Sequence, residues 1–129
     1  MDKKKISLVV SFRNENDVID VFLQETTQVL EAISNIEYEI IFINDGSTDN
    51  SLKKLIGHHI KDKRIKIIDM SRRFGPMESI MAGIEMSSGD AVINIDIDLQ
   101  DPPSLIPEMI RRWEEDGSEV VITTRLKRE

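Results

Sequence analysis

The sequence contains no cysteine, and this absence excludes disulfide bridges and thiolate metal sites. It also has no stretch that approaches the roughly 18 apolar residues of a membrane-spanning helix. The charged start Met1–Lys5 runs directly into a β-type segment, without the apolar core of a signal peptide. We therefore expect a cytoplasmic protein with no transmembrane segment in this chain, working in solution or at the inner face of the membrane.

Two glycine-rich nucleotide motifs are missing as well. Neither G-x-G-x-x-G nor G-x-x-x-x-G-K-[ST] occurs, so the sequence indicates neither a dinucleotide fold nor a P-loop. The 24 acidic residues outnumber the 17 basic ones, and the net charge of −7 argues against a general nucleic-acid binder. No internal repeat is present, and 129 residues suit one domain with a core large enough to fold alone.

What the sequence does contain is a regular alternation of strand and helix patterns. Short β-branched apolar runs predict strands, and apolar residues recurring every three or four positions predict helices between them. The expected strands are Ile6–Phe12, Tyr38–Asn44, Arg64–Met70, Ala91–Ile95 and Glu119–Thr124. The expected helices run through Val18–Ile33, Leu52–Ile60, Pro76–Ile84 and Leu105–Trp113, the second opened by Ser47-Thr48-Asp49 and the fourth capped by Ser104. This alternation predicts an α/β fold, an open and mostly parallel sheet with helices on both faces.

Polar side chains gather where the predicted strands end. Ligands of open parallel sheets bind beyond the carboxyl ends of the strands. The residues found there are Ser11, Phe12, Arg13, Asn14 and Glu15 after the first strand, Asp45 after the second, Asp96 and Asp98 after the fourth, and Arg125 after the fifth. Their convergence at one edge predicts a binding site. Asp45 is placed to accept hydrogen bonds from a base or ribose, whereas Asn14 and Glu15 fit a helix cap equally well.

Asp96 and Asp98 are the most informative pair. Side chains alternate along a strand, so both carboxylates face the same side at the end of Ala91–Ile95. Two carboxylates this close repel each other unless a cation lies between them, and oxygen ligands suit Mg²⁺ or Mn²⁺. The alternative is a solvated acidic loop that caps the next helix.

Other charged groups have simpler interpretations. We expect Arg72 and Arg73 to be solvated surface charges, and His58 and His59 to be a solvated pair rather than a metal site. Arg125, beside the predicted edge, is the arginine best placed to bind a phosphate through its bidentate fork.

Four blocks of the sequence resemble the family 2 glycosyltransferases of the GT-A fold. They are the segment from Ile6 to Glu15, Asn44-Asp-Gly-Ser-Thr-Asp49, Phe74-Gly75 with Ala82-Gly83 and Ser88-Gly89-Asp90, and Asp96-Ile-Asp-Leu-Gln-Asp-Pro-Pro103. The last block is most similar to the polyprenol-phosphate branch, which includes dolichol-phosphate mannosyltransferases and bactoprenol-phosphate glucosyltransferases. The family usually has proline followed by tyrosine or phenylalanine near Ser11–Arg13, a second aspartate at Asn44, and often asparagine at Arg73.

The resemblance implies a metal-dependent, inverting transfer of a sugar from a nucleotide diphosphate sugar to polyprenyl phosphate or a glycan. It implies that the end of the first strand, Asp45 and Asp96 bind the nucleotide. It also implies that Asp96, Asp98 and Gln100 hold Mg²⁺ or Mn²⁺, with catalytic roles for Asp98 and Arg125. Catalytic domains of the family are longer, so residues 1–129 are expected to form a single nucleotide-sugar-binding domain, the donor half.

Three alternatives remain open on the residues alone. One is a module that binds a nucleotide sugar without transferring it. A nucleotidyltransferase would also place carboxylates and a metal at strand ends, but its glycine- and arginine-rich pyrophosphate loop is absent after the first strand. A receiver domain would need an acidic pair where this chain has Ser11–Asn14. We also expect self-association through the last strand, Glu119–Thr124, or contact with a membrane partner.

Overall fold

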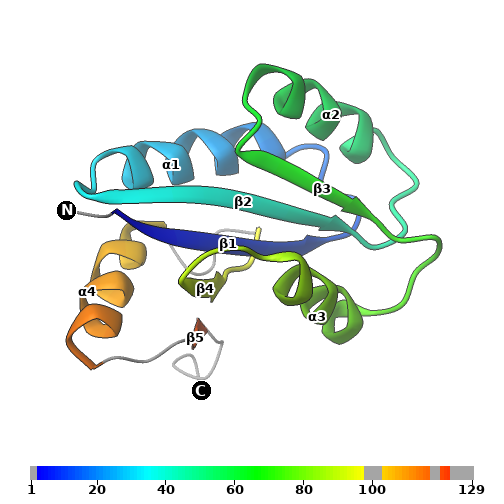
Figure 1. The fold of residues 1–129 in the computed structure, drawn as a ribbon. Helices are drawn as coiled ribbons and strands as arrows, with labels where there is room; N and C mark the ends of the chain where they lie inside the picture. The colour runs from blue at the N-terminus through cyan, green and yellow to red at the C-terminus, as the bar shows by residue number, and fades with distance from the viewer. Residues whose placement is uncertain (1–2, 98–102, 117–119, 123–129) are drawn as a thin grey trace.

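The computed structural model describes residues 3–97, 103–116 and 120–122. Its elements alternate along the chain as the sequence predicts (Figure 1). The strands are β1 (Lys4–Phe12), β2 (Ile36–Asn44), β3 (Ile65–Asp69), β4 (Ala91–Asn94) and β5 (Val120–Ile122). The helices are α1 (Ile19–Glu31), α2 (Ser51–Lys61), α3 (Pro76–Met86) and α4 (Ile106–Asp116), with a 3₁₀ turn at Pro103–Leu105 before α4.

The strands form one sheet in the order β3-β2-β1-β4-β5, and every described pair of neighbours is parallel. β1 occupies the centre, flanked by β2 and β4. Because all strands run the same way, their carboxyl ends meet at one edge. The α/β class and the parallel sheet are therefore confirmed.

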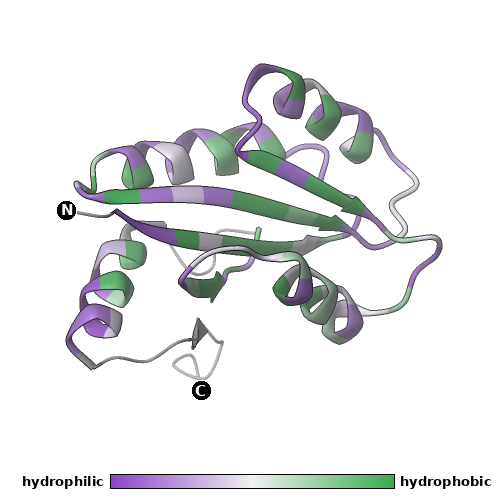
Figure 2. Cartoon of the chain, in the orientation of Figure 1, coloured by the Kyte–Doolittle hydropathy of each residue, from purple (hydrophilic) through white to green (hydrophobic). Residues whose placement is uncertain are grey.

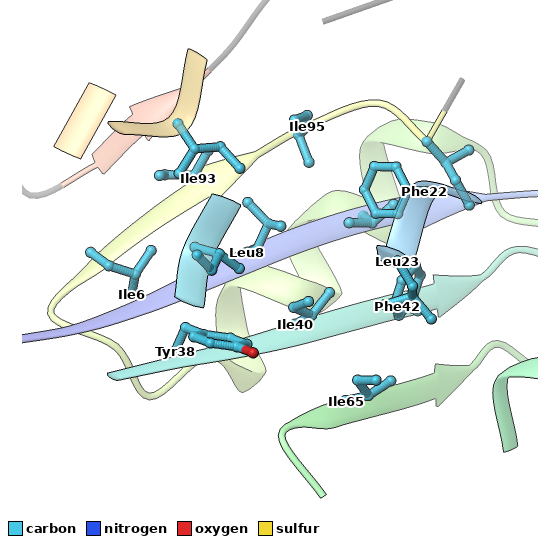
Figure 3. Packing of buried hydrophobic residues seen from close by; sticks show 14 of the residues in the cluster. Ile6, Leu8, Phe22, Leu23, Tyr38, Ile40, Phe42, Ile65, Ile93 and Ile95 are labelled. Carbon is cyan, nitrogen blue, oxygen red and sulfur yellow. The ribbon is translucent and has the colours of Figure 1, made fainter. Parts of the chain in front are cut away.

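Helices cover both faces of the sheet. On one face, alternate residues of β1 and β2 pack with α1, α2 and α4, and the edge-to-face pair Phe22 and Phe42 lies in this layer (Figure 3). On the other face, Val9, Ile41, Ile43 and Val92 form a smaller cluster beneath α3. The hydropathy of the chain follows this arrangement, since apolar residues are concentrated along the strands and each helix carries polar residues as well (Figure 2).

Helix α2 begins later than the sequence predicts. Ser47, Thr48 and Asp49 were expected to open it, but the first helical residue is Ser51. The reason is that these residues are hydrogen-bonded to the loop that follows β1. Ser47 Oγ and the N–H groups of Thr48 and Asp49 are hydrogen-bonded to Asn14, on the preceding loop. The N-cap residue is Asn50, and the Asp49 carboxylate accepts a hydrogen bond from the N–H of Ser51, the first helical residue.

Candidate functional site

A cavity of about 370 Å³ opens at the edge where the strands end. It is lined by Ser11, Phe12, Arg13, Glu15, Asp45, Arg73, Pro76, Ile80, Asn94, Asp96 and Ile97. These residues come from the ends of β1, β2 and β4 and from the loop and helix that follow β3. The cavity therefore lies where ligands of open parallel sheets bind.

Strand register brings the polar groups to the same level. Phe12 pairs with Asn44, so Asp45 follows immediately beyond the end of β1. Asn94 pairs with Val9, so Asp96, two residues later, comes level with Ser11. Asp96 is half-buried, whereas Arg13 is exposed. The cavity thus holds carboxylates on either side of the end of β1.

Asp45 is almost completely buried, with 3% of its surface exposed. One carboxylate oxygen accepts a hydrogen bond from the Phe74 N–H at 2.7 Å, and the other accepts one from the Gly75 N–H at 3.0 Å. These bonds tie the end of β2 to the loop before α3. Each carboxylate oxygen has two lone pairs, so Asp45 retains acceptor capacity on the side that lines the cavity.

Asn14 lies on the loop after β1 but is not among the residues that line the cavity. Its φ angle is 57°, and its side-chain oxygen accepts hydrogen bonds from the N–H groups of Thr48 at 2.7 Å and Asp49 at 3.2 Å. Its own N–H donates to Ser47 Oγ at 2.8 Å. Asn14 thus joins the loops that follow β1 and β2. The neighbouring Glu15 lines the cavity, and its N–H donates to Ser51 Oγ.

Arg73 is exposed, as a solvated surface charge would be, and it also lines the cavity. Pro76, Ile80 and Asn94 also line it and were not singled out from the sequence. The sequence did contain a signal for the residues after β3. The predicted sheet was mostly parallel, and β3 is indeed parallel to β2, so both strands end at the same edge. The loop after a strand of such a sheet is a candidate for the site in its own right.

His58 and His59 are not a solvated pair. His58 Nε2 lies 2.7 Å from Oδ1 of Asp20, a contact that lowers the pKa of that carboxyl. His59 Nδ1 lies 2.6 Å from the carbonyl oxygen of Ile65. Each imidazole therefore joins α2 to a neighbouring element, and neither faces the cavity.

The predicted metal ligands are only partly described. Asp98 and Gln100, and also Arg125, lie outside the described residues, which leaves Asp96. Within residues 3–97, 103–116 and 120–122, no three His, Asp or Glu side chains form a group that could hold a metal ion. The carboxylate of Asp96 is nevertheless an oxygen donor of the kind that Mg²⁺ and Mn²⁺ prefer. In the same described part of the chain, none of the helices has the length and apolar character needed to cross a membrane.

Comparison with known proteins places residues 7–129 within the family described as Glycosyl transferase family 2. An uncharacterized glycosyltransferase, YkcC, of Bacillus subtilis (strain 168) is 47% identical over 95% of the chain and 37% of its own length. A prophage bactoprenol glucosyl transferase homolog of Escherichia coli (strain K12) is 38% identical over 96% of the chain and 40% of its own length. The chain therefore spans about two fifths of the length of these relatives.

Solved structures share the fold at lower sequence identity. Mannosyltransferase PcManGT from Pyrobaculum calidifontis, in complex with GDP-Man and Mn²⁺, superimposes with a TM-score of 0.73 at 14% identity, covering 86% of this chain and 32% of that one. Glucosyl-3-phosphoglycerate synthase from Mycobacterium tuberculosis, in complex with Mn²⁺, UDP and glucosyl-3-phosphoglycerate, has a TM-score of 0.66 at 23% identity, covering 84% and 39%. These likenesses confirm the predicted GT-A fold.

Proposed function

The chain belongs to glycosyl transferase family 2, and we propose that it carries the donor-binding part of an enzyme that transfers a sugar from a nucleotide diphosphate sugar to polyprenyl phosphate. The observation that carries this proposal is the cavity at the carboxyl ends of β1, β2 and β4, which joins Asp45, Asp96 and two arginines. The bactoprenol glucosyl transferase homolog among the relatives supports a polyprenyl acceptor.

The donor lies across the end of β1 in this proposal. Its nucleoside contacts the segment Ser11–Glu15 and Asp45, whose free lone pairs accept hydrogen bonds from the base or ribose. Its diphosphate extends toward Asp96. Asp96, together with Asp98 and Gln100, would hold Mg²⁺ or Mn²⁺ on the diphosphate, as the Mn²⁺ complexes of the structural neighbours suggest. When bound, the cation would neutralise charge that develops on the leaving nucleoside diphosphate.

The acceptor phosphate needs positioning more than it needs a base. A phosphate with a second pKa near ~6 is largely ionised at neutral pH, so it attacks without losing a proton. We propose that Arg125 holds this phosphate through its guanidinium fork, in line with the bond to be broken. A single in-line displacement inverts the configuration at the sugar carbon. Asp98 would contribute to catalysis by helping to hold the cation that binds the diphosphate.

Calorimetry of UDP, GDP and their sugar esters, each in Mn²⁺ or Mg²⁺ and again in chelator, tests the proposal. We expect at least one nucleoside diphosphate to bind in the presence of metal and to bind more weakly in chelator. Equal binding in chelator would remove the metal from the proposal. The absence of binding by any nucleoside diphosphate under either condition would overturn the donor-binding function itself.

A further inference from the structure

Helix α3 packs on the sheet through one side, and its outer side carries exposed methionines. Met77 and Met81 lie one turn apart, with 67% and 56% of their surfaces exposed. Together with Ala82 and Ile84, which are half-buried, they line a pocket of about 450 Å³. Methionine side chains are flexible and polarisable, and exposed methionines are typical of surfaces that bind other proteins.

The methionines have an acidic border. Glu78 and Glu85 line the same pocket and are seven residues apart, which corresponds to about 10 Å along a helix axis. In the part of the chain that the structure describes, neither glutamate forms an ion pair. This surface, the α3 face, consists of Met77, Glu78, Met81, Ala82, Ile84 and Glu85.

Helix α2 carries the complementary pattern on its own outer side. Ile56 and Ile60 lie one turn apart, with 44% and 65% of their surfaces exposed. Lys53 and Lys61 are also exposed and are eight residues apart, or about 12 Å along the axis. Among the described residues, neither of these lysines has an acidic partner. This surface, the α2 face, consists of Lys53, Ile56, Gly57, Ile60 and Lys61.

The two faces match in spacing and in charge. Each carries a pair of exposed apolar side chains one turn apart and a pair of like charges, and the charges of the two faces are opposite. The small residues Gly57 and Ala82 leave room for the helices to approach closely. Because α2 and α3 lie on opposite faces of the sheet, the α2 face and the α3 face cannot meet within one molecule (Figure 1). A second copy of the chain brings them together.

We propose that the chain self-associates by packing the α2 face of one copy against the α3 face of the next. The isoleucines and methionines form the apolar centre of this contact, and each lysine lies opposite a glutamate. Pairing two α3 faces or two α2 faces would instead bring like charges together, which disfavours both arrangements. The contact is therefore heterologous. It leaves an unused face on each outer copy, so further copies add in the same direction.

Two single substitutions test the contact in the 129-residue chain. Ile60→Asp disrupts the α2 face, and Met81→Asp disrupts the α3 face. A contact between two helices is small and therefore weak, so sedimentation equilibrium should extend to about 1 mM protein. There the wild-type chain should form a concentration-dependent series of oligomers, and each variant alone should be monomeric. An equal mixture of the two variants should form dimers and nothing larger, since each variant retains one intact face.

Val21→Asp is the matched control, because Val21 is an exposed apolar residue of α1 outside both faces. It should associate as the wild-type chain does. None of the three substituted residues lines the cavity, so the result is independent of the proposed function. A wild-type chain that stays monomeric at about 1 mM, or a mixture of Ile60→Asp and Met81→Asp that stays monomeric, would overturn the proposal. Oligomers of either variant alone would assign self-association to another surface, such as the edge at β5.

Reversal of the charges tests the pairing of lysine with glutamate. Changing both lysines of the α2 face to glutamate should raise the dissociation constant about ten-fold or more, and so should changing both glutamates of the α3 face to lysine. The chain that carries all four reversals should associate as the wild-type chain does, because every pair is restored with its signs exchanged. Thermal unfolding confirms that each variant is folded. If the four reversals together do not restore association, the lysines and glutamates do not face each other.

Discussion

Lys66 Nζ lies 2.7 Å from Oε1 of Glu39, a carboxylate that is only 1% exposed. The other oxygen of Glu39 accepts hydrogen bonds from Ser7 Oγ and from the N–H of Ser88, and Lys5 Nζ lies 3.7 Å from Oε1. The buried charge thereby connects β1, β2, β3 and the turn before β4. This cluster lies toward the amino ends of the strands, away from the cavity, so its contribution to stability can be measured apart from ligand binding.

We predict that the Glu39 cluster stabilises the fold above an acidic pH window. Burial by itself raises the pKa of Glu39. Hydrogen bonds from Lys66, Ser7 and Ser88 and the charge of Lys5 have the opposite and larger effect, so the pKa falls from an ordinary value of 4.5 to about 2. A carboxyl with a depressed folded-state pKa stabilises the fold fully above its unfolded pKa and loses that contribution as the pH falls toward 2. Urea unfolding of the wild-type chain between pH 7 and pH 2.5 should therefore show stability falling below about pH 4.5.

Glu39→Gln is the variant that isolates this effect. It should lower the free energy of unfolding at pH 7 by about 1–3 kcal/mol, because Ser7, Ser88 and Lys66 lose a charged acceptor. It should also flatten the pH dependence below pH 4.5 relative to the wild-type chain. If the free energy of unfolding of Glu39→Gln falls as steeply below pH 4.5 as that of the wild-type chain, other carboxylates cause the loss of stability in acid.

Asn14→Ala should destabilise the fold more than Asn35→Ala does. Both asparagines have a positive φ, 57° and 64°, so the backbone strain introduced by alanine is similar in the two variants. Only Asn14 holds another loop, through the N–H groups of Thr48 and Asp49. We expect a difference of about 1–2 kcal/mol in the free energy of unfolding, measured with urea. Equal losses would show that the bonds of Asn14 to the β2–α2 loop add nothing to stability.

The alternation of strand and helix, and the arrival of Asp45 and Asp96 at one edge, could be predicted from the sequence. Both follow from local patterns, because short apolar runs predict the strands and the carboxyl ends of parallel strands meet at one edge, where ligands bind. The start of α2 could not be predicted in the same way. Thr48 and Asp49 lie outside the helix, and their N–H groups donate hydrogen bonds to Asn14. Asn14 is 34 residues from Thr48 and 35 from Asp49 in the sequence, so no local pattern records these bonds.

Arg73 shows a second limit of local patterns. Local patterning does not distinguish Arg72 from Arg73, since both are long cations in a loop between two apolar segments. Of the two, only Arg73 lines the cavity, and the difference arises from contacts of the folded chain: the hydrogen bonds that Asp45 accepts and the close approach of Gly46. Local periodicity identified the strands that form the edge, whereas contacts between distant loops determine which side chains enter the cavity.

Gly83→Ala should destabilise the packing of α3 on the sheet. A Cβ atom at Gly83 would lie 2.6 Å from Cγ1 of Val9 and 2.7 Å from Cδ1 of Ile43, so these side chains or the helix would have to shift. We expect a net loss of about 1–2 kcal/mol, because overpacking exceeds the gain in helix propensity. Gly57→Ala is the matched control: nothing lies within 4 Å of the added atom, and stability should rise by about 0.5–1 kcal/mol. Thermal unfolding of the two variants should therefore shift in opposite directions, and a shift in the same direction would contradict the close packing of α3.

Asp96→Asn should weaken nucleotide binding only when metal is present. The substitution keeps the size of the side chain but removes the charge of an oxygen ligand, which should lower affinity by about ten-fold or more because affinity depends on the number of charged ligands. In Mn²⁺, the dissociation constant for UDP or GDP should rise accordingly, while in chelator it should equal that of the wild-type chain. Asp90→Asn, at the opposite end of the same strand, removes the same charge and should leave both values unchanged. If Asp96→Asn lowers affinity equally in chelator, Asp96 contacts the nucleotide directly and the metal lies elsewhere.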